Sequence, residues 1–281
     1  MTPQPGIWRW VDRLEVALYR NGWPARLSRL LGYRPSIQVV EHQVPLAGFP
    51  DGTPALTVAF ASDFHAGPTT DPHLLHEAAA ALTAARPDVL LLGGDYVALD
   101  SRHIERLAPV LGGIPAPLGR YAVLGNHDHW NGAAPIVRAL ERAGIELLVN
   151  SNRRLPAPYG NIWICGIDDP ISGAPDPQAA LAGADGLRVV LMHAPANLVG
   201  LDGARFDLAL CGHTHGGQLA LPGGRPLIVA PGAHSRRYSR GRFRLDNGAA
   251  LLVSVGIGCS TVPLRLNAPP EILICRLFGL A

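Results

Sequence analysis

The sequence predicts an α/β protein, a four-layer αββα sandwich of two mixed β-sheets flanked by helices. Strand-like and helical runs alternate as far as about residue 149, whereas the apolar runs beyond residue 160 are short and mostly strand-like. Two sheets packed face to face, with the helices outside, accommodate both halves of this pattern. Periodicity alone leaves a single doubly wound sheet as the open alternative.

Each element is expected from its local pattern of apolar and turn-forming residues. Strands are expected at 37–44, 57–62, 88–94, 121–125 and 145–149, and again at 161–167, 187–193, 208–211, 227–230, 249–255 and 272–277. Helices are expected at 72–85, 101–111 and 133–143. The stretch 171–186 is rich in Pro, Gly, Ala and Asp and is expected to be a loop with one helical turn.

Residues 1–34 are expected to form an amphipathic helical segment ahead of a single domain at 35–281. An apolar stripe at helical spacing runs through Ile7, Val11, Leu14 and Leu18, and a second short helix is expected to begin at Pro24. The tryptophans and arginines of this segment suit the headgroup region of a membrane. Packing of the stripe on the domain itself explains the pattern equally well.

The composition indicates one large globular domain, because 48% of the 281 residues are hydrophobic and only 16% are charged. We find no uninterrupted apolar stretch of about eighteen residues and no secretory signal pattern. A cytoplasmic location is therefore expected, peripheral on the inner membrane if residues 1–34 bind lipid. The four cysteines stand singly in strand-like runs, which predicts buried reduced thiols.

All 24 basic residues are arginine, and this excludes several enzyme classes. Without lysine there is no P-loop and no Schiff-base nucleophile. No Gly-x-Ser-x-Gly elbow occurs, which disfavours a serine hydrolase. The net charge of +2 is too small to indicate a nucleic-acid footprint, so no nucleic-acid partner is expected.

Five apolar runs end in side chains that bind hard or borderline metal ions. These side chains are Asp63 and His65, Asp95, Asn126, His193, and the pair His213 and His215. The first three of the runs are spaced close to the roughly 30 residues of a strand, crossover helix and parallel strand. Right-handed crossovers place the carboxyl ends of such strands at one edge of a sheet, where these side chains should meet.

The mixture of imidazole nitrogens with carboxylate and amide oxygens suits Mn, Fe or Zn better than Ca. Seven ligands are too many for one four-coordinate ion. Two divalent metal ions that share a carboxylate are the natural solution, and Asp95, on the middle strand, is best placed to bridge them.

The ordered motifs Asp-x-His, Gly-Asp, Gly-Asn-His-Asp, an isolated His and Gly-His-x-His, between residues 57 and 217, resemble those of the calcineurin-like metallophosphoesterase superfamily. The tail at 256–272 looks like the branch of small bacterial membrane-associated phosphodiesterases. The resemblance implies two metal sites with one shared ligand. One site is Asp63, His65, Asp95 and His215, and the other is Asp95, Asn126, His193 and His213.

The same resemblance implies that His127 faces the scissile phosphate, where it stabilises charge or protonates the leaving oxygen. Asp128 would orient or polarise His127. The expected reaction is hydrolysis of a phosphodiester or pyrophosphate by in-line attack of a metal-bridging hydroxide, with Mn as the expected metal and Fe or Zn open. The amphipathic start favours a lipid-linked substrate such as UDP-2,3-diacylglucosamine of lipid A synthesis.

Two alternatives stay open. A nuclease or cyclic-nucleotide phosphodiesterase would use the same metals, although a nuclease needs stacking aromatics along a basic groove and aromatic residues are 6% of the chain. A non-catalytic metal-binding scaffold is the alternative of another class. It is disfavoured because a scaffold has no need of the full ligand set together with His127.

Overall fold

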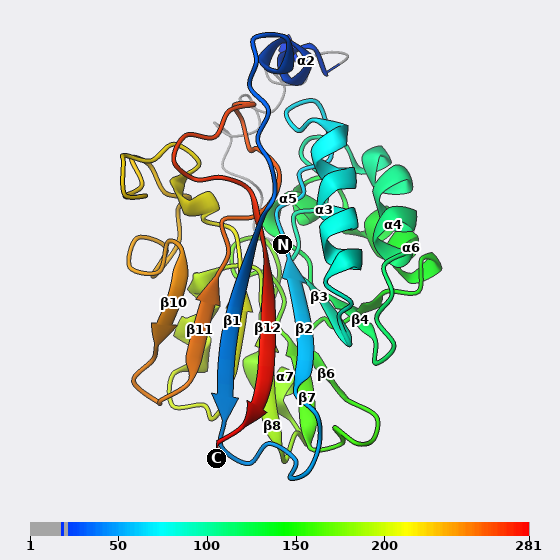
Figure 1. Cartoon of the computed structure of the whole chain (residues 1–281), viewed down its shortest axis with the longest axis vertical. Helices are drawn as coiled ribbons and strands as arrows, with labels where there is room; N and C mark the ends of the chain where they lie inside the picture. Colours follow the sequence, from blue (N-terminus) through cyan, green and yellow to red (C-terminus); the bar gives the residue numbers. More distant parts are fainter. Residues whose placement is uncertain (1–17, 20–21, 281) are drawn as a thin grey trace.

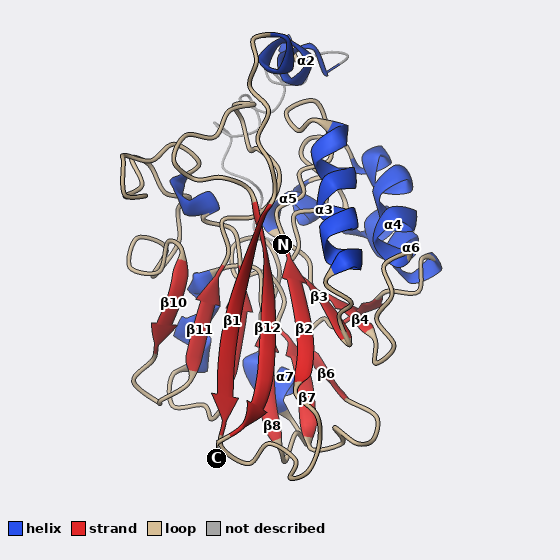
Figure 2. Ribbon diagram, viewed as in Figure 1, coloured by secondary structure: helices blue, strands red, loops and turns tan. Residues whose placement is uncertain are grey.

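The computed structural model describes residues 18–19 and 22–280, which contain two six-stranded sheets (Figures 1 and 2). The strand order of the first sheet is β1 (Gln38–Leu46), β12 (Glu271–Gly279), β2 (Leu56–Ala61), β3 (Val89–Leu92), β4 (Arg120–Ala122), β5 (Glu146–Leu147). The order of the second is β10 (Gly241–Arg244), β11 (Ala250–Val253), β9 (Leu208–Cys211), β8 (Leu187–Leu191), β7 (Ile162–Gly166), β6 (Ser151–Arg154). Both sheets are mixed, because β12 is antiparallel to β2 and the edge strands β10 and β6 are antiparallel to their neighbours.

Helices cover the outer faces of both sheets. The outer face of the first sheet carries α3 (Pro72–Ala84), α4 (Ile104–Gly112) with its leading 3-10 turn η2 (Ser101–His103), and α6 (Ala133–Arg142). The second sheet is covered by α7 (Pro177–Leu181) and η3 (Pro195–Leu201). Of the remaining helices, α2 (Trp23–Leu30) lies at one end of the molecule, and α5 (Asn126–Trp130) and η4 (His215–Gly217) follow strand ends.

The main core lies between the two sheets, and strand alternation explains how it forms. In β2, Val58 and Phe60 pack into the layer between the sheets, while Ala59 and Ala61 pack against the helices. Both faces of β2 and β3 are therefore buried, which is why their sequences read as continuous apolar runs. The four-layer sandwich predicted from the sequence is confirmed, and a single doubly wound sheet is excluded.

Three details of the strand assignment differ from expectation, and one of them is that β10, with the sequence Gly-Arg-Phe-Arg, was not predicted. The strand predicted at 227–230 is wrong, because this run lies in a loop whose neighbour Pro226 makes only an isolated bridge to Ala220. Strand β6 was not predicted, since its sequence Ser-Asn-Arg-Arg has no apolar alternation and it forms a strand only by pairing with β7. The short helix expected to begin near Pro24 is α2. The apolar stripe expected at residues 7–18 lies almost wholly outside the described residues.

The arrangement of β2, β3 and β4 positions the candidate site. These strands are parallel neighbours, so their carboxyl ends share one edge of the first sheet, at the end of the molecule that carries α2 (Figure 1). All four cysteines are buried and unpaired, as predicted. None of the described helices has the length and apolar character needed to cross a membrane.

Candidate metal centre

The seven predicted metal ligands meet where strand ends of the two sheets face each other, and all seven are buried. The first sheet supplies four of them, on the segments after β2, β3 and β4, and the second sheet supplies three, after β8 and β9. In chain order they are Asp63, His65, Asp95, Asn126, His193, His213 and His215. Side chains 150 residues apart in sequence thus come within hydrogen-bonding distance.

One part of the cluster joins the ends of β2 and β9. Nε2 of His65 lies 3.0 Å from Nε2 of His215, and the same nitrogen of His215 lies 3.5 Å from Oδ1 of Asp63. One potential ligand atom from each of these three residues fits within a span of 4.8 Å. The three side chains therefore converge closely enough to share one ion.

The other part is centred on His193. Its Nε2 lies 3.4 Å from Oδ2 of Asp95, 3.2 Å from Nδ1 of His213 and 3.2 Å from Oδ1 of Asn126. Oδ2 of Asp95 is also 3.6 Å from Nε2 of His65. Asp95 thus touches both parts of the cluster, as expected of the residue on the middle strand.

The donor atoms of the cluster are arranged to bind metal ions and cannot all hydrogen-bond to one another. Two pairs of imidazole nitrogens face each other at 3.0 and 3.2 Å, and a neutral ring has only one N–H to place between such a pair. Several lone pairs therefore converge on the same small volume together with two carboxylates. Divalent cations satisfy this arrangement of nitrogen and oxygen donors, which suits borderline metals.

The backbone at the ligands is in an uncommon conformation. Five of the seven have positive φ, namely Asp63 (53°), His65 (43°), Asp95 (54°), His213 (70°) and His215 (52°). Non-glycine residues in this region cost on the order of 1–3 kcal/mol each and concentrate at functional sites. The packing around the strand ends holds these residues so that their side chains turn inward.

Glycines beside the ligands leave the space that the cluster occupies. A Cβ on Gly125 would overlap Oδ1 of Asp95 and come within 2.7 Å of the ring of His193. A Cβ on Gly212 would overlap the carboxylate of Asp63. The glycines of the Gly-Asn-His-Asp and Gly-His-x-His motifs are thus needed for close approach of backbone to ligand.

Burial keeps most of these imidazoles neutral, and neutral imidazole is the form that binds metal. Desolvation lowers the pKa of His213 to about 4 and lowers the pKa values of His65 and His215 well below the ordinary range. Burial also lowers the pKa of His193, but the charge of Asp95 outweighs it and raises that pKa well above its ordinary value. The centre of the cluster therefore attracts positive charge.

His127 lies at the edge of the cluster and is only partly buried. Its Nδ1 lies 3.0 Å from the carbonyl oxygen of Ala98, and its backbone N–H donates to Oδ1 of Asp95 at 2.9 Å. The ring packs edge-on against His65 and is covered by Trp130. With Nδ1–H donated to a carbonyl, Nε2 is the nitrogen left to meet a substrate.

Asp128 has contacts other than the expected one with His127. Its buried carboxylate accepts hydrogen bonds from the backbone N–H groups of Asp95 (2.8 Å), Tyr96 (2.9 Å) and Gly125 (2.9 Å). Burial and the neighbouring charge of Asp95 raise the pKa of Asp128 to about 7. Asp128 thus ties the segment after β3 to the segment after β4, and the Ala98 carbonyl orients His127.

Arg265 is a residue for which the sequence predicts no role, yet its guanidinium contacts the candidate ligand His215. Arg265 is buried and its Nη2 lies 3.0 Å from Nδ1 of His215. Its other donors reach backbone carbonyls, including those of Gly258, Val255 and Ala268, and among the described residues it has no carboxylate partner. Guanidinium only donates, so this contact requires Nδ1 of His215 to accept, and a metal ion at Nε2 would then displace the ring's one proton and bind the imidazolate form of this histidine.

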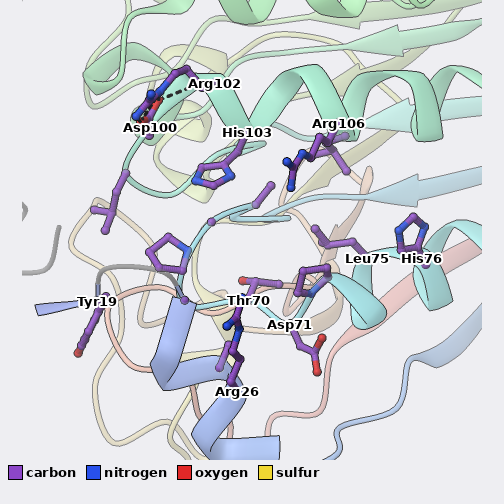
Figure 3. A pocket seen from close by; sticks show the side chains of 18 of the residues that line it. Tyr19, Arg26, Thr70, Asp71, Leu75, His76, Asp100, Arg102, His103 and Arg106 are labelled. Atoms are coloured by element: carbon purple, nitrogen blue, oxygen red, sulfur yellow. Dashed lines mark hydrogen bonds and ion pairs between the residues drawn. The ribbon is translucent and has the colours of Figure 1, made fainter.

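A cavity of about 670 Å³ lies between α2 and the helices α3 and α4 (Figure 3). The cavity borders the metal centre. Its lining residue Ala66 directly follows His65, and its lining residue Leu99 directly follows Ala98, whose carbonyl contacts His127. Leucine and valine side chains of α3 and α4 form an apolar wall. Four arginines also line the cavity, namely Arg26, Arg29, Arg102 and Arg106.

Two of these arginines pair with aspartates of the same cavity, at 2.6 and 3.9 Å. Within the described residues, Arg26 and Arg106 make no ion pair. Figure 3 shows both side chains pointing into the space between α2 and α4. The cavity therefore offers an apolar wall together with two cations that lack a carboxylate partner.

Comparison with known proteins agrees with this geometry. The chain is 32% identical over 246 residues to "Phosphodiesterase YaeI" of Escherichia coli (strain K12), covering 85% of this chain and 88% of that protein. It is 28% identical over 247 residues to "Uncharacterized metallophosphoesterase YkuE" of Bacillus subtilis (strain 168), covering 86% and 85%. Among solved structures, a dimetal phosphatase from Danio rerio shares the fold, with a TM-score of 0.50, 13% identity and coverage of 74% and 90%.

The region that matches the family model contains the residues of the metal centre. The family model for calcineurin-like phosphoesterases matches residues 56–217, from the first residue of β2 to the last residue of η4. This range contains all seven clustered side chains and His127. The chain therefore belongs to the calcineurin-like phosphoesterase family and is a metal-dependent phosphoester hydrolase.

Proposed function

We propose that this hydrolase cleaves a phosphodiester or pyrophosphate bond at a pair of divalent metal ions held by the seven clustered side chains. The observation that supports this most strongly is the convergence of four imidazole nitrogens, an amide oxygen and two carboxylates on one buried volume, with nitrogen–nitrogen separations of 3.0 and 3.2 Å. The similarity to the phosphodiesterase YaeI favours a diester over a monoester.

In this proposal the two ions share Asp95. The ligands of one are Asp63, His65, Asp95 and His215, and those of the other are Asp95, Asn126, His193 and His213. A pair of such ions neutralises phosphate charge and lowers the pKa of coordinated water. Mn is the proposed metal, and Fe and Zn accept the same donors.

The chain's own residues supply orientation and proton transfer. His127 is held by the Ala98 carbonyl so that Nε2 faces the reacting phosphate, where the doubly protonated ring would stabilise charge through its Nε2–H or pass that proton to the leaving oxygen. We assign Asp128 a positioning role, because its three backbone hydrogen bonds fix the segments that carry Asp95 and His127.

We further propose that the substrate is lipid-linked and that the protein acts as a peripheral enzyme at a membrane. The cavity beside the metal centre supports this, since its apolar wall suits an acyl chain and Arg26 and Arg106 suit a second anionic group. UDP-2,3-diacylglucosamine has both features. It is our specific candidate.

The metal site is tested by reconstituting the purified full chain with Mn²⁺, Fe²⁺ or Zn²⁺. We expect two ions per chain by elemental analysis and hydrolysis of bis(p-nitrophenyl) phosphate. Asp95→Asn should lose both, whereas the matched control Asp185→Asn, an exposed aspartate far from the cluster, should keep both. Full activity with a single bound ion would contradict the dinuclear proposal.

The substrate is tested by comparing UDP-2,3-diacylglucosamine with UDP-N-acetylglucosamine, which lacks the long chains. We expect a higher kcat/KM for the lipid. The double variant Arg26→Gln/Arg106→Gln should lower that value about tenfold, while the control Arg138→Gln, an exposed arginine of α6, should not. Equal rates on both substrates would refute the lipid proposal and leave the phosphoesterase proposal intact.

A further inference from the structure

Exposed apolar side chains gather at one end of the molecule. Of the fifteen large hydrophobic side chains that are exposed in the described part of the chain, eleven lie in three segments. These segments are 18–31, which includes α2, and the loops 221–228 and 262–266. They contribute Leu18, Trp23, Leu27, Leu30, Leu31, Leu221, Leu227, Ile228, Val262, Leu264 and Leu266. We call these three segments the apical surface.

Hydrogen bonds join the three segments into one surface. The hydroxyl of Tyr33, just after α2, accepts from the backbone N–H of Arg265 at 2.7 Å and donates to its carbonyl at 3.2 Å. The loop 262–266 in turn bonds to the other loop, where Ala220 N donates to Leu266 O at 2.8 Å. Figure 1 shows α2 at the end of the molecule opposite the C-terminus.

Charge on these segments is of one sign. No aspartate or glutamate occurs at 16–40, 208–245 or 247–270. The same stretches carry exposed arginines, including Arg26, Arg29 and Arg34 near α2 and Arg225 in the loop 221–228. With a net charge of only +2 for the whole chain, the acidic residues are concentrated elsewhere.

The apical surface borders the metal centre. The loop 221–228 follows the ligand His215 after five residues, and Pro231 just beyond it lies 3.2 Å by its carbonyl oxygen from Nε2 of His213. The loop 262–266 carries Arg265, whose guanidinium contacts His215. Whatever covers the apical surface therefore lies next to the ligands supplied by the second sheet.

We propose that the apical surface docks the protein on a membrane that contains anionic lipids. Leucine, isoleucine and tryptophan side chains enter the boundary between headgroups and acyl chains, and the arginines meet lipid phosphates. The absence of acidic residues and the mixing of apolar tips with arginine favour a lipid surface over a second protein. One part of this proposal rests on the proposed function: docking would bring the metal centre to the depth of the phosphate of a lipid-linked substrate.

The test is sedimentation of the full chain with two kinds of vesicle. One contains phosphatidylcholine alone, and the other also contains phosphatidylglycerol, at about one anionic lipid in three. We expect binding to the anionic vesicles that weakens in high salt. Leu30→Ser/Leu31→Ser and Leu227→Ser/Ile228→Ser should each lower the partition coefficient at least about tenfold. The control Val199→Ser removes a side chain of η3 that is 60% exposed and lies outside the apical surface, and it should bind like the parent.

Hydrolysis of bis(p-nitrophenyl) phosphate is measured on the same preparations, so that docking and catalysis are judged separately. The apical variants should keep this activity, since none of the four side chains touches the metal cluster. Docking without any hydrolysis would overturn the proposed function alone. Absence of vesicle binding by the parent chain, equal binding to neutral vesicles, or a dimer in sedimentation equilibrium that Leu30→Ser/Leu31→Ser dissociates would each overturn the docking proposal.

Discussion

The metal centre and the apical surface adjoin each other and are built in opposite ways. In the centre all seven proposed ligands are buried, and five of them take a left-handed backbone conformation at strand ends from two sheets. In the apical surface, side chains such as Leu30 and Ile228 are 83% and 73% exposed and stand on a short helix or on loops. From this difference we infer that catalysis requires a rigidly held cluster of buried side chains, whereas the proposed membrane docking requires side chains that protrude into solvent.

Among variants expected to keep both metal ions, the largest effect is expected from His127→Ala. We expect both ions to stay bound, because His127 is not among the proposed ligands, while kcat falls by about 10² to 10⁴. Elemental analysis and steady-state kinetics on one preparation measure the two quantities. Loss of metal in this variant would show that His127 is a ligand.

Arg265 tests whether the loop that carries it supports the metal centre. Replacement by Met removes the donor to His215, and we expect a 10- to 100-fold weaker metal affinity, as for other residues that orient a ligand. Arg265→Lys should recover part of it. The readout is the rise in Tm on adding Mn²⁺, compared with the Tm of the metal-free protein, so that misfolding and loss of affinity are separated. An unchanged rise would leave Arg265 a purely structural residue.

His129 and Asp168 give a pH-dependent test of how firmly α5 is held. Nε2 of His129 lies 2.9 Å from Oδ1 of Asp168. Burial alone would lower the pKa of His129, but the bond and charge of Asp168 raise it overall. Burial alone would raise the pKa of Asp168, but His129 and backbone amides lower it overall.

The signs of these two shifts define a pH window. A raised histidine pKa gives stability that is present below the unfolded value near 6.5 and is lost as pH rises through the folded value. A lowered aspartate pKa gives stability that is present above about 3.9 and is lost as pH falls through the folded value. His129→Gln should therefore cost about 1–2 kcal/mol of unfolding free energy near pH 5–6 and less above pH 8. A pH-independent cost in denaturant unfolding would contradict the charged pair.

The smallest effect is expected at the apical surface. Leu30→Ser/Leu31→Ser should change the free energy of unfolding by less than about 0.5 kcal/mol, because side chains that are mostly exposed contribute little to the folded state. Urea unfolding without vesicles measures this. A cost of several kcal/mol would mean that these leucines pack within the protein, and the contrast between the two regions would fail.

The sequence predicted much of the fold because buried strands and surface helices leave strong periodic patterns. The run around Leu90 is continuously apolar and became β3, and the run around Val189, interrupted only by Arg188, became β8. Elements without such a pattern were missed or misplaced. Strand β6 is polar and depends on β7 for its hydrogen bonds, and the apolar run at 227–230 lies in a loop whose exposed side chains belong to the apical surface.

The sequence alone indicates the chemistry of this protein, because the identity and order of the candidate ligands can be read along the chain. A parallel strand that ends in Asp or His places that side chain at the edge of the sheet. Tertiary structure alone decided the rest. The bonds of Asp128 to backbone amides, the contact of Arg265 with His215 and the joining of α2 with two distant loops all link residues far apart in the chain. No local pattern records such contacts, since they follow from how neighbouring strands and loops pack in three dimensions.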